Sequence, residues 1–90
     1  METFYVELSR RAEKEYAQLE GKLKNRVRKA IDILSQNRVP VKELDIEKIT
    51  GTESDYRIRI QTHRIQYTVH WKEKKVTIFK IERKKDRTYK

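Results

Sequence analysis

Three arginines occur at alternating positions in a segment that is typical of a β-hairpin. Arg57 and Arg59 alternate with apolar residues on the first predicted strand, and Arg64 lies near the start of the second. Successive side chains of a strand point to opposite faces of a sheet, so these guanidiniums should share the face that turns away from the core. Like charges on one face repel each other, and folding alone gives no reason to gather them, whereas a polyanion would bind there. The spacing therefore predicts a phosphate-binding face.

The predicted hairpin occupies residues 55–71, with a turn at residues 61–63. Its apolar residues recur with a period of two, which directs them toward a core; they are Tyr56, Ile58, Ile60, Ile65, Tyr67, Val69 and Trp71. A second tight turn at residues 72–74 leads to a strand at residues 76–81. That strand is apolar at both parities, which is typical of a central strand covered on both faces.

The N-terminal half predicts one strand and two helices. A short alternating strand at residues 4–8 precedes Ser9, which can cap a helix by accepting a backbone N–H bond. Gly21 is expected to end this helix, and apolar residues at helical spacing predict a second, antiparallel helix at residues 23–34. Residues 42–54 show no clear periodicity, but three of their side chains should contact the core: Leu44, Ile46 and Ile49.

The order of these elements predicts an α+β fold. An N-terminal strand, a helical hairpin and a three-stranded antiparallel meander (β-α-α-β-β-β) should pack with the helices on one sheet face, which leaves the other face open. Ninety residues are enough for one modest core, so we expect residues 1–90 to form a single domain.

The composition excludes several kinds of site. The chain has no cysteine, which rules out disulfides, thiolate zinc sites and cysteine nucleophiles. Its two histidines, His63 and His70, are too few for a convincing metal site, so we expect no metal and no cofactor. No apolar run approaches the roughly 20 residues of a membrane span. The N-terminus does not resemble a signal peptide, so we expect a cytoplasmic protein with no membrane partner.

The net charge of +9 is concentrated toward the C-terminus. Residues 72–90 contain nine Lys/Arg and three Asp/Glu, a net charge of +6, whereas residues 1–49 contain eleven and nine, a net charge of +2. A basic end beside an arginine-lined sheet face is typical of a nucleic-acid-binding protein. The alternative is a soluble surface that is merely rich in lysine.

Three short motifs resemble the RelE/ParE toxin superfamily, and more specifically RelE-type toxins of archaeal or thermophilic character. They are Tyr-Arg-Ile-Arg-Ile at 56–60, His-Arg-Ile-Gln-Tyr at 63–67 and Arg-Lys-Lys-Asp-Arg-Thr-Tyr at 83–89. The resemblance covers essentially the whole chain. It implies the toxin of a type II toxin–antitoxin pair, an endoribonuclease that cuts mRNA in the ribosomal A site. It also implies a RelB-like antitoxin as partner, in a complex that can be a heterotetramer, besides the ribosome and mRNA.

The resemblance further implies a site. Arg57, Arg59 and Arg64 match basic family positions on the two hairpin strands. Arg83 matches a family arginine after the last strand, and Tyr89 matches a family tyrosine six positions later. The basic run of the tail is expected either to contact ribosomal RNA or to be solvated; its further residues are Lys84, Lys85 and Arg87.

Such a site suits metal-independent RNA cleavage. The ribose 2′-OH attacks the adjacent phosphate to give a 2′,3′-cyclic phosphate, and guanidiniums stabilise the charge that develops on the phosphate oxygens. Tyr89 would stack on a base or orient the hydroxyl. Well-studied RelE members carry lysines at the positions of Arg57 and Arg59, and arginine stays protonated in proteins, so the proton acceptor is open. His63 is a candidate, although a turn histidine is more often solvated.

Each site residue also has a structural interpretation. Arg57 and Arg59 could belong to an ordinary solvated strand face, and Arg64 could support the turn by donating hydrogen bonds to its carbonyls. Arg83 could form a surface ion pair with Glu82 or Asp86. Tyr89 fits a frayed end of the chain.

Two other functions remain open. A ParE-like toxin acting on DNA gyrase shares the expected fold without the basic face, and a non-catalytic RNA-binding module would explain the charge alone. The four arginines and the tyrosine favour the endoribonuclease. We expect its antitoxin to be acidic and to lie along the outer groove between the helical hairpin and the sheet.

Overall fold

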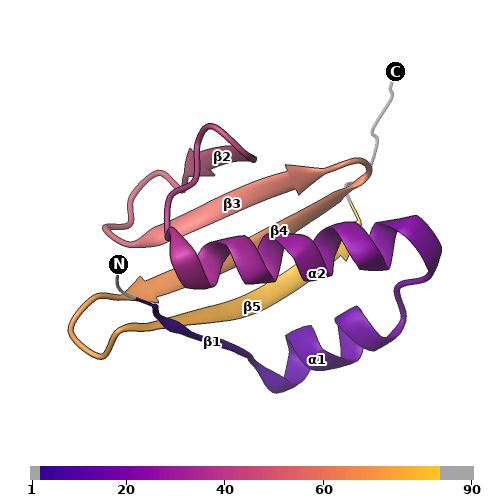
Figure 1. Cartoon of the computed structure of the whole chain (residues 1–90), viewed down its shortest axis with the longest axis horizontal. Helices are drawn as coiled ribbons and strands as arrows, with labels where there is room; N and C mark the ends of the chain where they lie inside the picture. The colour runs from indigo at the N-terminus through magenta and orange to yellow at the C-terminus, as the bar shows by residue number, and fades with distance from the viewer. Residues whose placement is uncertain (1–2, 84–90) are drawn as a thin grey trace.

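A five-stranded mixed sheet with two helices on one face forms the domain (Figure 1). The computed structural model describes residues 3–83. The strand order is β1-β5-β4-β3-β2, in which β1 is parallel to β5 and all other neighbours are antiparallel. The elements are β1 (Tyr5–Leu8), α1 (Arg10–Ala17), α2 (Gly21–Gln36), β2 (Asp45–Lys48), β3 (Asp55–Ile60), β4 (His63–His70) and β5 (Lys75–Arg83).

The predicted α+β class, with an N-terminal strand and helices on one sheet face, is confirmed. The sequence did not predict β2, which extends the expected three-stranded meander by one strand at the sheet edge. Only one of its four residues, Ile46, is apolar, so its alternation is too short to recognise. Ile46 packs against the core and lies opposite Ile58 of β3, so tertiary pairing rather than local pattern forms this strand.

The two helix boundaries near residue 20 differ from the prediction. Ser9 caps α1 as expected, since its side chain accepts a 3.1 Å hydrogen bond from the Ala12 N–H. However, α1 ends at Ala17, and its last carbonyls accept bonds from the N–H groups of Gln18 and Leu19. Gly21, with φ of +59°, is instead the first residue of α2. Its left-handed conformation, which glycine tolerates, lies where the chain turns from one helix into the next.

A β-bulge explains why β5 is apolar at both parities. Tyr67 of β4 lies opposite Ile78 while Gln66 lies opposite Lys80, so Phe79 is an extra residue in β5. The core-facing residues of β5 are therefore Val76, Ile78 and Ile81. The predicted central position is confirmed, since β5 lies between β1 and β4. The expectation that this strand is covered on both faces was wrong, because the bulge shifts the parity of an apolar pattern that faces one core.

Tyr67 is buried in the core as predicted, but Trp71 is 50% exposed. β4 ends at His70, so Trp71 begins the turn to β5 and contacts Phe4 edge-on, with ring centroids 5.9 Å apart. The first hairpin turn is also shorter than predicted, because His63 already pairs with Ile60.

The Tyr67 hydroxyl provides a test of the core. It donates a 2.7 Å hydrogen bond to the Arg38 carbonyl and lies on a ring stacked against Tyr56. Tyr67→Phe keeps the ring and removes this hydrogen bond, so the free energy of unfolding should fall by about 1 kcal/mol. Urea denaturation measures the change, with the exposed Tyr5→Phe as control. Equal stability of the two variants would contradict the importance of this bond.

Candidate functional site

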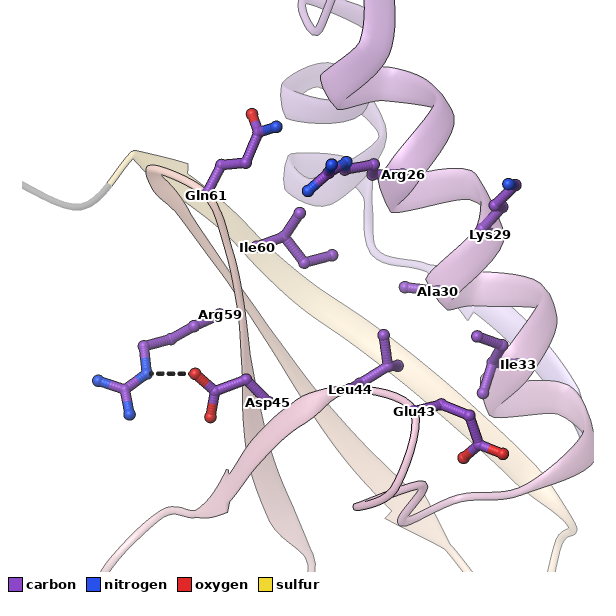
Figure 2. A pocket seen from close by; sticks show the side chains of 10 residues that line it. All are labelled: Arg26, Lys29, Ala30, Ile33, Glu43, Leu44, Asp45, Arg59, Ile60 and Gln61. Carbon is purple, nitrogen blue, oxygen red and sulfur yellow. Dashed lines mark ion pairs between the residues drawn. The ribbon is translucent and has the colours of Figure 1, made fainter.

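Arg57, Arg59 and Arg64 lie on the same face of the sheet, opposite to the helices. Arg59 of β3 pairs directly with Arg64 of β4, and Arg57 pairs with Gln66 two residues along. Side chains of directly opposed residues have Cβ atoms only about 5 Å apart. Figure 2 shows Arg59 directed away from α2, whereas the neighbouring Ile60 is directed toward it. We call this surface the arginine face, and among residues 3–83 no helix or further sheet covers it.

Two carboxylates of β2 pair with two of these arginines. Arg59 Nε lies 3.3 Å from Asp45 Oδ2, and Arg57 Nη2 lies 3.2 Å from Glu47 Oε2 (Figure 2 draws the former pair). Glu47 also reaches Arg59 Nη2 at 3.8 Å. The premise that folding gives no reason to gather these charges was therefore wrong. Asp45 and Glu47 are two residues apart in the sequence, as Arg57 and Arg59 are. Antiparallel pairing of the two segments therefore places each carboxylate opposite one arginine, and this matched spacing could have indicated the ion pairs from the sequence.

Arg64 is the member of the arginine face without a carboxylate partner among residues 3–83. It lies between Arg59 and Glu82, and the Glu82 carboxylate pairs instead with Lys80 at 3.2 Å. Its Nε is buried and has no hydrogen-bond partner, so the expected support of turn carbonyls is not observed. A desolvated cationic donor without a partner is unfavourable, and an anion such as phosphate would satisfy it.

Arg83 is not brought together with the other three arginines. It pairs with His63, which has the parity of the core residues Ile65 and Tyr67, and both line a hollow against α1 together with Glu15 and Gln18. The bulge at Phe79 causes this placement, since an unbulged β5 would put Arg83 on the arginine face. The alternative ion pair with Glu82 is not observed, and the Glu82 carboxylate pairs with Lys80 instead. The other alternative partner, Asp86, lies outside the described residues.

His63 has a lowered pKa, caused first by burial and then by the positive charge of Arg83. Its Nδ1 lies 3.1 Å from the Thr62 hydroxyl. Like Arg83, it is on the helix side of the sheet, so the structure does not bring this candidate base to the arginine face.

Four of the predicted site residues lie outside the described residues: Lys84, Lys85, Arg87 and Tyr89. Within residues 3–83 no cluster of three or more His, Cys, Asp or Glu side chains is arranged to hold a metal ion. The same residues contain no helix that is long and apolar enough to cross a membrane.

Comparison with known proteins decides the family. The chain is 32% identical to RelE1 of Methanocaldococcus jannaschii over 81 residues, which are 90% of each chain. That relative carries the provisional name of a toxin. The chain belongs to the RelE toxin family. It is also 30% identical to a chain of the RelE–RelB complex of Pyrococcus horikoshii, with a TM-score of 0.81, and the match covers 90% of this chain and 94% of that one.

The isolated RelE toxin of E. coli shares the fold, with a TM-score of 0.77 and 18% identity over 93% of this chain and 87% of that one. No family model matches the chain. The resemblance inferred from three short motifs is thus confirmed at the level of family and fold, and the assignment of individual site residues stays a prediction.

The pairing of His63 with Arg83 predicts a measurable pKa change. Arg83→Gln removes the positive charge, so the His63 pKa, which lies below its ordinary value of 6.5, should rise. Arg57→Gln makes the same change in charge on the other face and should raise it less. NMR titration of the His63 ring measures both variants, and an equal response would contradict the separation of the two faces.

The same shift predicts how stability depends on pH. Because the His63 pKa is lower in the folded protein, the unfolded chain binds the proton first as the pH falls. The His63 contribution to stability should therefore be present above about pH 6.5 and be lost below it. Urea denaturation between pH 5 and 8 compares wild type with His63→Gln, and wild type should lose stability relative to the variant as the pH falls below about 6.5.

Proposed function

We propose that this protein is the toxin of a type II toxin–antitoxin pair and a ribosome-dependent endoribonuclease that cuts mRNA in the cytoplasm. Membership of the RelE toxin family supports the toxin role. The observation that supports phosphate chemistry is Arg64, a partly buried guanidinium on an uncovered sheet face, directly opposite Arg59 and without a carboxylate partner among residues 3–83.

The chemistry assigned to this face is a transesterification that converts a 3′,5′-phosphodiester of RNA into a 2′,3′-cyclic phosphodiester. The ribose 2′-oxygen forms a bond to phosphorus, the bond to the 5′-oxygen breaks, and the products are a 2′,3′-cyclic phosphate and a 5′-OH. Negative charge on the non-bridging oxygens increases as the reaction proceeds. Arg64 and Arg59 donate charge-assisted hydrogen bonds to these oxygens, which stabilise the transition state more than the ground state.

Proton transfer is assigned to groups outside the arginines. Arg57, Arg59 and Arg64 stay protonated and cannot accept the 2′-OH proton. Burial and the charge of Arg83 lower the pKa of His63, but its ring lies on the helix side of the sheet. We therefore infer that solvent or a ribosomal group accepts the 2′-OH proton and that solvent or a ribosomal group also donates a proton to the departing 5′-oxygen, while this face binds and orients the phosphate. The role of Tyr89 in holding a base remains part of the proposal that rests on family resemblance.

Substitution of Arg64 tests the proposed reaction. Arg64→Ala should reduce cleavage of translated mRNA about 100-fold or more, the usual cost of removing one transition-state donor. Primer extension on a messenger in translating ribosomes measures the cut positions and rates. Arg28→Ala, an exposed helix arginine far from the face, is the control and should cut normally.

The same experiment separates the competing functions. Cuts at codon-related positions by the wild-type protein support the endoribonuclease. Inhibition of DNA supercoiling without any cut would instead indicate a gyrase toxin, and binding of RNA with neither effect would indicate a non-catalytic module.

The antitoxin proposal has a structural candidate for its docking site. A hollow between α2 and the segment that enters β2, shown in Figure 2, has four apolar lining residues: Ala30, Ile33, Leu44 and Ile60. Its charged lining has a basic excess, since three basic residues stand against two acidic ones: Arg26, Lys29 and Arg59 against Glu43 and Asp45. An acidic, RelB-like segment with apolar anchors fits this combination. The P. horikoshii relative is found in such a complex with RelB.

Reversal of one rim charge tests this docking site. Lys29→Glu should weaken binding of a co-expressed RelB-like antitoxin about tenfold, chiefly through slower association. Its neighbour Arg28→Glu, which does not line the hollow, carries the same charge change and is the control. Surface plasmon resonance with purified partners measures the rates; equal effects of both variants would indicate general charge attraction rather than this site.

A further inference from the structure

The arginine face carries its own fixed anions. Three guanidiniums, from Arg57, Arg59 and Arg64, share it with the carboxylates of Asp45 and Glu47, so their local charges sum to +1 rather than +3. The carboxylates are not on a loop that can swing away. Backbone pairing of β2 with β3 holds Asp45 opposite Arg59 and Glu47 opposite Arg57.

We propose that Asp45 and Glu47 are specificity-determining residues that keep the arginine face from retaining free RNA, so that it engages only RNA presented to it by the ribosome. This inference rests on the proposed function. An RNA phosphate that approaches Arg57 or Arg59 must displace a carboxylate and then remain close to it. RNA at low concentration competes poorly, whereas RNA held at the site has a high effective concentration and displaces the carboxylates.

The strength of these ion pairs suits displacement. The Asp45 and Glu47 side chains are 62% and 47% exposed and the Arg59 side chain is 46% exposed, whereas the Arg57 side chain is 24% exposed. Exposed pairs contribute at most about 1 kcal/mol each, whereas phosphate offers several charge-assisted hydrogen bonds to a guanidinium pair. The carboxylates therefore lower the affinity for RNA without closing the site.

A purely structural role for the two carboxylates predicts a different outcome. If the carboxylates serve only to relieve repulsion among the arginines, removal of their charge would let the guanidiniums move apart and would weaken RNA binding. Asp45→Asn and Glu47→Gln retain shape and a hydrogen-bond acceptor while removing the charge, and Ile46, which packs against the core, is left in place. The two roles can thus be distinguished by the sign of the change in affinity.

The experiment is binding of a fluorescent single-stranded RNA oligonucleotide, followed by anisotropy without ribosomes. The double variant Asp45→Asn/Glu47→Gln should bind about tenfold more tightly than wild type. If two more phosphates are engaged, the slope of log K against log salt should steepen by about 1.4. The control, Glu53→Gln/Glu73→Gln, makes the same change in net charge at exposed turn positions and should bind like wild type.

Unchanged or weaker binding by the folded double variant would overturn the inference, as would an equal gain in the control. Glu47→Gln alone, which touches both paired arginines, gives the same test if the double variant does not fold. Adding Arg57→Gln and Arg59→Gln to the double variant should remove most of the gain, because these are the arginines that the two carboxylates pair with. Ribosomal cleavage by the wild-type protein is measured separately, so failure of the proposed function and failure of this inference give different results.

Discussion

The register of β3 against β4 determines both the core and the arginine face. Ile58 lies opposite Ile65 on the helix side, and one residue further Arg59 lies opposite Arg64 on the other side. A slip of one residue would exchange the two faces and bring arginines beneath the helices, at a large cost in desolvation. Burial of the isoleucines therefore places two guanidiniums, those of Arg59 and Arg64, opposite each other on the other face.

The repulsion between these guanidiniums is offset by the edge strand β2, which few other interactions hold in place. β2 contributes one core-packing residue, Ile46, and otherwise pairs its backbone and its two carboxylates with β3. The acidic strand reduces the repulsion that the register creates, so a structural and a functional interpretation of Arg57 and Arg59 apply together. Arg64 differs because its cross-strand neighbour Glu82 is engaged by Lys80.

The sequence predicted those features that depend on regular alternation or local chemistry. The hairpin, the Ser9 cap, the buried Tyr67 and the grouping of three arginines all follow from period and residue type. It could not predict β2, because four residues with one isoleucine carry almost no periodic signal. It also misplaced Trp71, because the alternation gives no sign of where β4 ends.

The bulge at Phe79 is the feature with the largest consequence for the site. An apolar run at both parities fits either a strand covered on both faces or a one-residue insertion, and only long-range pairing with β4 distinguishes them. The insertion moves Arg83 to the side of His63 and α1, away from the arginine face. A basic residue at the family spacing can therefore keep its position in the sequence and still lie on a different surface. For that reason Arg64, whose place follows from unbroken pairing with β3, supports phosphate binding more strongly than Arg83 does.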